Sequence, residues 1–269
     1  MLSFLGQGFA LSLGPQGAQL ALRSGLWRPR FQLLGSMVWE THASDAQRSA
    51  ALDALLLRRT VTGSTLDVLV ADVWTPTASV QPPANGGTLE DLQAAVALRL
   101  RAVTDAATGW EAASEPRVSG RFVASALRTS LLDVLLDQCQ RHGLHLVSVQ
   151  PLFAAVWNHW RASLASGQWL GICGAGVLTL CVAPKHHMEQ LRRLDFATQD
   201  AQDPHWPVDA AQRECLRLGL PLPATLALCG AVPLPWRDTM RTAASARRGT
   251  PVVYLGPVGD APSLWGLST

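Results

Sequence analysis

The residues with the clearest chemical potential are three closely spaced glycines, Gly171, Gly174 and Gly176. Backbone amides of a glycine-rich turn can point towards one centre and bind the oxygens of a phosphate group. A plain hairpin turn between the apolar stretches on either side explains the same glycines, because glycine is the usual residue where a chain turns sharply. The spacing therefore predicts a hairpin, with phosphate binding as the alternative.

Asp72 is a second candidate, since it follows the apolar run from Leu66 to Ala71, which is short enough to be a buried strand. A carboxylate at a strand end can bind a metal ion or act as a base. More often it caps the turn that follows. We favour the capping role and keep the chemical one as the alternative.

The other reactive side chains do not form a recognisable site. His186 and His187 are adjacent, so on an extended chain they point to opposite faces and cannot share a metal ion. Standard enzyme signatures such as Gly-x-Ser-x-Gly, a phosphate loop ending in Gly-Lys-Ser, and Cys-x-x-Cys are missing from the sequence. Five cysteines lie in apolar runs, which predicts buried thiols and a reducing compartment; they are Cys139, Cys173, Cys181, Cys215 and Cys229.

Composition narrows the function classes. The 269 residues are 48% hydrophobic, which is enough for a large core and favours two lobes, with one compact unit as the alternative. The formal net charge of +2, from 22 basic and 20 acidic residues, gives no electrostatic footprint for nucleic acid. Neither a signal peptide nor an apolar run of the roughly 18 residues that a membrane span needs is visible. We expect a soluble cytoplasmic protein.

The first half of the sequence predicts a hairpin, which is followed by a strand, a helix and a buried strand. Strands over 8–13 and 18–22 flank the turn from Gly14 to Gly17, a third strand covers 31–40, and Asp45 is the expected cap of the next helix. Residues 76–87 are predicted to be a surface loop or the turn into an inserted piece, and Thr88 with Asp91 forms a capping box. The segment from Trp110 to Ser119 is predicted as an edge strand or loop.

The stretch from Arg121 to Arg161 predicts strand, helix, strand and helix. Ser130 and Asp133 have capping-box spacing, Gly143 is the expected left-handed helix stop, and Pro151 the start of the second helix. The second half then repeats the first, and its predicted elements are a hairpin of 169–173 and 177–183, a polar loop 195–207, a helix 209–218 stopped by Gly219, a strand 225–229, a weak helix 237–248 and a strand 252–255.

Two hairpins that open two lobes, each followed by helices and strands, resemble the actin-like ATPase superfamily. The order of elements is similar to the PilM protein of type IV pilus assembly and the cytoplasmic part of GspL from type II secretion. The residue-level likeness is confined to the run RFVASAL, HGL, HLVSVQP and PLFAAVWN and to the glycine turns. The resemblance implies an α/β, two-lobed actin-like (ribonuclease H-like) fold with mixed sheets and an inserted subdomain. It implies a first lobe at 1–75, an inserted subdomain and return at 76–150, and a second lobe at 151–269.

The resemblance also implies where a nucleotide would bind. The first phosphate turn would be at Gly14, the second would include Gly174 and Gly176, and the adenosine turn would contain Gly230. Active members carry an aspartate before the first turn, where this chain has Ser12, and another at the start of the second hairpin, which begins Trp169-Leu170-Gly171 here. Without these carboxylates magnesium loses its anchors, so we expect a degenerate site with no cofactor and slow or absent hydrolysis.

Ten tryptophans against one tyrosine point to buried or partner-covered surfaces. Trp157 and Trp160 share a helical face, for which the protein core is the default interpretation. Trp27, Trp74 and Trp206 lie in turn-like or loop-like contexts and are the better candidates for binding a partner.

These observations predict a non-catalytic cytoplasmic scaffold of a pilus or secretion assembly platform. It would bind a segment of an inner-membrane protein, such as a PilN-like or GspM-like tail, with a secretion ATPase as a further candidate partner. Membrane contact would come only through that partner, since the sequence given ends at Thr269 without a span. The rival hypotheses are an actin-like ATPase or small-molecule kinase that uses ATP with an unconventional metal site, built on Asp72 or another acid brought in by the fold, and a relic fold with a new ligand in the cleft.

Overall fold

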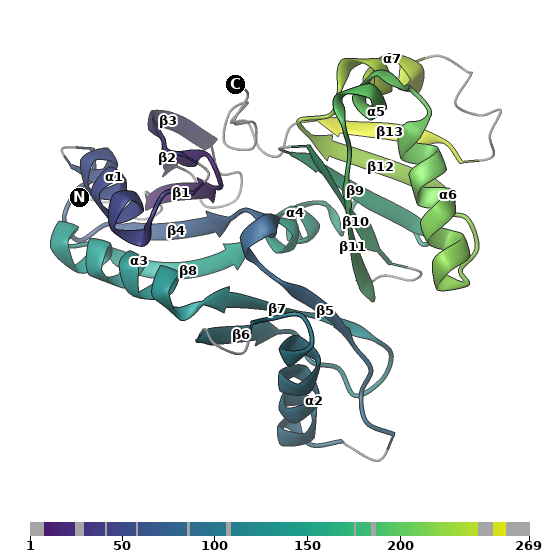
Figure 1. Ribbon diagram of the computed structural model, residues 1–269, viewed down its shortest axis with the longest axis horizontal. Coiled ribbons are helices and arrows are strands. Elements are labelled where there is room, and N and C mark those ends of the chain that lie inside the picture. Colours follow the sequence, from purple (N-terminus) through teal and green to yellow (C-terminus); the bar gives the residue numbers. More distant parts are fainter. Residues whose placement is uncertain are drawn as a thin grey trace.

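A computed structural model describes residues 8–24, 30–40, 42–57, 59–84, 87–105, 109–174, 176–183, 187–241 and 250–256. Within these ranges the strands form two five-stranded sheets and one three-stranded sheet. Each large sheet is the centre of one lobe, and the small sheet belongs to a piece inserted into the first lobe (Figure 1). The predicted α/β, two-lobed fold with mixed sheets and an inserted subdomain is confirmed.

The first sheet is built from a hairpin and three further strands, in the order β3-β2-β1-β4-β8. In β4 every second side chain is fully buried, as expected for a strand, whose successive side chains point to opposite faces of the sheet. β1, β2 and β3 are antiparallel, whereas β4 and β8 run parallel to β1. The bounds are β1 Gly8–Gly14, β2 Gly17–Ser24, β3 Arg30–Val38, β4 Thr65–Val70 and β8 His145–Pro151.

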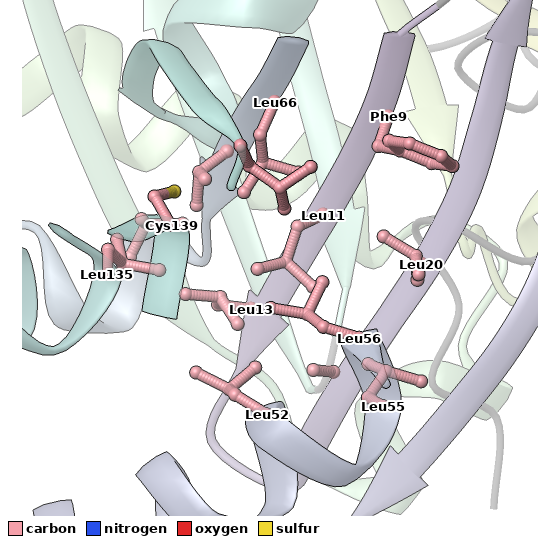
Figure 2. Close-up of a cluster of buried hydrophobic side chains, with 14 of the residues drawn as sticks. Phe9, Leu11, Leu13, Leu20, Leu52, Leu55, Leu56, Leu66, Leu135 and Cys139 are labelled. Carbon is pink, nitrogen blue, oxygen red and sulfur yellow. The ribbon is translucent and has the colours of Figure 1, made fainter. Parts of the chain in front are cut away.

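Helices α1 (Asp45–Leu56) and α3 (Thr129–His142) cover one face of this sheet (Figure 1). Their apolar faces pack against side chains from β1, β2 and β4, which removes a large apolar area from water. Figure 2 shows the resulting cluster, in which the leucines of α1 meet those of β1 from one side and α3 closes it from the other; the labelled residues are Phe9, Leu11, Leu13, Leu20, Leu52, Leu55, Leu56, Leu66, Leu135 and Cys139.

An inserted subdomain lies between β4 and α3 and has a small core of its own. Helix α2 packs on its antiparallel sheet, whose order is β5-β7-β6. The hydroxyl of Ser79 donates a hydrogen bond of 2.8 Å to the carbonyl of Glu189, so the insertion also contacts the second lobe. The bounds are a 3₁₀ turn η1 Asp72–Trp74, β5 Thr77–Val80, α2 Leu89–Arg101, β6 Trp110–Ser114 and β7 Phe122–Arg128.

The second lobe repeats the topology of the first. Helix α4 (Leu152–Trp160) crosses between the lobes, and the second sheet has the order β11-β10-β9-β12-β13 with the same pattern of antiparallel and parallel neighbours. The bounds are β9 Gln168–Gly174, β10 Val177–Val182, β11 Gln190–Asp195, α5 Thr198–Gln202, α6 Trp206–Leu218, β12 Thr225–Gly230, α7 Leu234–Arg241 and β13 Val252–Gly256.

The repeat extends to single hydrogen bonds at the strand ends. The amide of Ala71, just after β4, donates to the carbonyl of Leu13 at 2.8 Å. The amide of Ala231, just after β12, donates to the carbonyl of Cys173 at 2.9 Å. In both lobes the chain leaving the central parallel strand is therefore tied to the hairpin beside it.

Several local predictions need correction. Ser44, not Asp45, is the N-cap of α1, because its hydroxyl accepts the amide of Gln47 while Gln47 reaches back to the amide of Ser44. The predicted box at Ser130 and Asp133 does not form, because α3 already begins at Thr129. The capping box of α2 at Thr88 and Asp91 is confirmed.

Three elements also differ from expectation. The predicted loop 76–87 contains β5, the predicted loop 195–207 contains α5, and β11 was not predicted. β5 and β11 are short strands whose conformation depends on pairing with neighbouring strands rather than on their own pattern. α5 is a helix of five residues at whose start the amide of Ala197 donates to Asp200. The weak helix predicted over 237–248 begins earlier, at Leu234, and residues 242–249 lie outside the described ranges. No helix in the described ranges is long and apolar enough to cross a membrane.

The helix stops at Gly143 and Gly219 provide a matched test of stability. Both glycines are left-handed, with φ of 62° and 64°. We expect Gly219→Val to lower the free energy of unfolding by about 1–3 kcal/mol, because a β-branched residue resists this conformation. Gly143→Val should lower the free energy of unfolding by about 1 kcal/mol more, because a Cβ at position 143 would lie 2.5 Å from Cγ2 of Thr62. A Cβ at position 219 would have no atom within 4 Å. Urea unfolding measures both, and an unchanged midpoint for Gly143→Val would contradict the helix end.

Candidate functional site

A pocket of about 130 Å³ lies between the two lobes, where the ends of their central strands face each other. The first lobe contributes the turn after β1 and the end of β4, and the second contributes β9 and β10. In open α/β sheets, ligands bind beyond the carboxyl ends of parallel strands, and this pocket has that position. The described residues that line it are Ser12, Leu13, Gly14, Pro15, Leu69, Val70, Ala71, Asp72, Val73, Leu152, Ile172, Gly174, Val177 and Thr179.

The structure brings only two of the four predicted nucleotide-turn glycines to this pocket. Gly14 and Gly174 line it from opposite lobes, but Gly176 and Gly230 are not among its lining residues. Both have positive φ, 74° at Gly176 and 86° at Gly230. A side chain at Gly230 would also collide with the carbonyl of Cys173. Local backbone geometry thus accounts for these two glycines, and a nucleotide role for the four stays a prediction.

Asp72 is the residue on which this site depends. It begins the 3₁₀ turn after β4, and its Oδ1 accepts a hydrogen bond of 2.9 Å from the amide of Phe153 in the first turn of α4. The four leading amides of a helix have no partners within the helix, so a carboxylate satisfies one of them and is favoured by the helix dipole. Thr179, on β10 of the second lobe, also hydrogen-bonds to Asp72. Asp72 thus caps α4, and it joins the two lobes.

Comparison with solved structures identifies the architecture. A protein from Bacteroides thetaiotaomicron VPI-5482, described as having an actin-like ATPase fold and unknown function, aligns over 95% of this chain and 94% of its own, with a TM-score of 0.62 and 9% identity. This chain has the actin-like ATPase fold.

Two further structures with this fold agree with the resemblance seen in the sequence. The PilM-PilN type IV pilus biogenesis complex aligns over 93% of this chain and 88% of the matched chain, with a TM-score of 0.63 and 17% identity. The cytoplasmic domain of EpsL, an inner-membrane component of the type II secretion system of Vibrio cholerae, aligns over 83% and 82%, with a TM-score of 0.52 and 14% identity. Neither a protein-family model nor a curated protein matches the sequence.

The actin-like fold implies a magnesium nucleotide, and the described lining residues are a poor fit for one. Asp72 is the only carboxylate among them, and its Oδ1 is already bonded to α4. Lysine and arginine, which would neutralise phosphates, are missing from the lining set. A volume of about 130 Å³ is also below the roughly 300–1,000 Å³ of ordinary ligand pockets. Within the described ranges, no three His, Cys, Asp or Glu residues are grouped so as to hold a metal ion.

A larger cavity, of about 350 Å³, lies between the first lobe and the inserted subdomain. Two tryptophans line it, and each has an arginine over its ring. The guanidinium of Arg48 is 5.0 Å from the centre of the Trp74 ring, and that of Arg128 is 5.4 Å from the centre of the Trp110 ring. Arginine over the face of a tryptophan ring is a favourable cation–π contact. We call this cavity the two-tryptophan cavity.

The predicted partner-binding tryptophans therefore have different surroundings. Trp74 lines the two-tryptophan cavity. Trp206 stacks on Trp236 with ring centres 5.3 Å apart and also contacts Phe196 in the second lobe. Trp27 lies outside the described residues. Trp110 was not selected from the sequence, because its segment is short and polar and only the folded structure brings it to the cavity that Trp74 also lines.

The remaining candidates are structural or lie outside the described ranges. All five cysteines are free and buried, and burial raises the pKa of the thiols of Cys173 and Cys181 well above the ordinary range, so they pack as small apolar groups. Nε2 of His187 is 3.4 Å from a carboxylate oxygen of Glu189. His186 is outside the described residues.

Burial of Asp72 raises the pKa of its carboxyl from 3.8 to about 6, although the hydrogen bonds from Phe153 and Thr179 and the charge of Arg193 act in the opposite direction. One pKa unit corresponds to about 1.4 kcal/mol, so the ionised form costs about 3 kcal/mol in the folded state. This cost is absent well below pH 3.8, where the carboxyl is protonated in both the folded and the unfolded state. It develops as the pH rises from 3.8 to about 6, because over that range the unfolded state ionises while the folded state stays protonated, and it is complete above about pH 6.

The variant Asp72→Asn tests this assignment. The asparagine oxygen can still accept the amide of Phe153 but carries no charge. We expect similar unfolding free energies for the two proteins at about pH 3 and a variant that is about 2–3 kcal/mol more stable at pH 7. Urea unfolding at several pH values measures the difference in unfolding free energy between the two proteins. The other titratable groups are the same in both proteins, so their contributions cancel in this difference. A difference independent of pH would contradict the buried position of Asp72.

Proposed function

We propose that this chain is a non-catalytic cytoplasmic scaffold in the assembly platform of a type IV pilus or type II secretion system. The observation that carries the proposal is the likeness, over 93% of the chain, to a structure of the PilM-PilN complex, together with the likeness to the cytoplasmic domain of EpsL. The protein would be peripheral to the inner membrane and would bind a PilN-like or GspM-like tail. A secretion ATPase is a further candidate partner, and no nucleic acid is expected.

The chemistry of the interlobe pocket supports the non-catalytic part of the proposal. Phosphoryl transfer depends on metal ions and cationic groups that neutralise charge on the phosphates. Apolar side chains such as Leu69 and Ile172 line the pocket instead, and the one carboxylate among its described lining residues already accepts a hydrogen bond from the first turn of α4. We therefore expect neither ATP nor magnesium as a resident cofactor.

The two-tryptophan cavity is our proposed docking site for the partner. Tryptophan and arginine are the residue types most enriched among side chains that dominate binding energy. Trp110 is the first residue of β6, which is an edge strand of its sheet within the described ranges. An extended tail could pair with the edge of β6 and place an apolar side chain between Trp74 and Trp110. Main-chain hydrogen bonds and one buried anchor would then supply the affinity.

Binding of the neighbouring membrane protein's cytoplasmic tail tests this site. We expect Trp110→Ala to weaken binding of a synthetic tail peptide at least tenfold, measured by isothermal titration calorimetry, because a buried aromatic anchor contributes about 1.4 kcal/mol or more. Leu216→Ala is the matched control, since Leu216 is an 84% exposed apolar residue of α6 in the other lobe. An equal loss of affinity in both variants would place the docking site elsewhere. If no tail encoded beside this gene binds the protein, the scaffold proposal is overturned.

Nucleotide binding separates the proposal from its rival. An actin-like ATPase or small-molecule kinase with Asp72 in its metal site has one observation in its favour, the position of Asp72 between the two hairpins. We expect no saturable signal when a fluorescent ATP analogue with magnesium is titrated to millimolar concentration. Saturable binding that is lost in Asp72→Asn would support the rival.

A further inference from the structure

The interlobe pocket has the size and lining of a site for a small apolar group. Its volume is about 130 Å³, and leucine, valine and isoleucine side chains supply most of its wall. An apolar protein cavity of about 150 Å³ is known to bind benzene rather than water. A ring or short alkyl chain therefore fits here, and it would lie against Leu69, Leu152 and Ile172, which come from three different elements.

The charge of the pocket distinguishes between ligand classes. Asp72 is the only ionisable residue among its described lining residues. The groups that act on its carboxylate are the amide of Phe153, the hydroxyl of Thr179 and the charge of Arg193, while the buried thiol of Cys181 also interacts with it. An anionic ligand would add a second negative charge in an apolar setting. A cationic ligand would instead offset the cost of burying the negative charge of Asp72.

We propose that this pocket binds a small primary amine with an apolar body, whose ammonium group donates a hydrogen bond to Asp72. The hydroxyls of Ser12 and Thr179 flank the same wall and can accept from the remaining ammonium hydrogens. The body is limited to about six to eight carbon atoms by the pocket volume. The inference goes beyond the scaffold role and does not depend on it.

Three probes of similar size test the proposal: benzylamine, benzyl alcohol and benzoate. We expect benzylamine to shift the amide resonances of Ser12, Gly14, Gly174 and Thr179 saturably in the ¹⁵N-labelled full chain. Benzyl alcohol should bind the same amides more weakly, and benzoate should not bind. Affinity for benzylamine should rise between pH 5 and pH 7.5, because Asp72 ionises over that range while the amine stays protonated.

Two variants complete the test. Asp72→Asn should weaken benzylamine binding at least tenfold while changing that of benzyl alcohol less than twofold. Val177→Phe, which fills the pocket from the start of β10, should abolish both. Preserved dispersion of the other amide resonances shows that each variant is folded. Equal benzylamine affinity in wild type and Asp72→Asn, binding of benzoate, or shifts confined to other parts of the molecule would overturn the proposal.

Discussion

The carboxylate of Asp72 lies where three parts of the molecule meet. It follows the central strand of the first sheet, caps the helix α4 that leads to the second lobe, and hydrogen-bonds to Thr179 on β10. A carboxylate in this position carries a cost, because the apolar wall beside it raises its pKa to about 6. The capping of α4 and the contact between lobes offset part of that cost. One of the contacts between the lobes thus rests on an acid whose ionised form the apolar environment disfavours.

The interlobe pocket lies at the ends of the central strands and has a mostly apolar described lining. The two sheets have the same paired topology, and their hairpins bring Gly14 and Gly174 to this pocket from opposite lobes. Since the backbone topology is held by the large cores of the two lobes, the lining residues can change without loss of the fold. Function must therefore be argued from the lining and not from the fold.

Much of the fold could be predicted because its elements carry strong local signals. The hairpin around Gly14 to Gly17, the capping box at Thr88 and the left-handed stop at Gly143 are each set by a few neighbouring residues. The weak predictions share one physical feature. β5 and β11 are short strands without a clear apolar alternation, and they become ordered only by pairing with partners from other parts of the chain.

The candidate site was predicted only in part. The sequence by itself determined the glycine turns, the absence of flanking carboxylates at Ser12 and Trp169, and an acid at the end of β4. Only the tertiary structure decided that Asp72 reaches the amide of Phe153, 81 positions away, and that Trp74 and Trp110 line the same cavity. Local patterns fix the conformation of a few residues, whereas these contacts depend on how whole lobes pack. The packing of the lobes is determined by many buried side chains together, so it cannot be predicted from any single stretch of sequence.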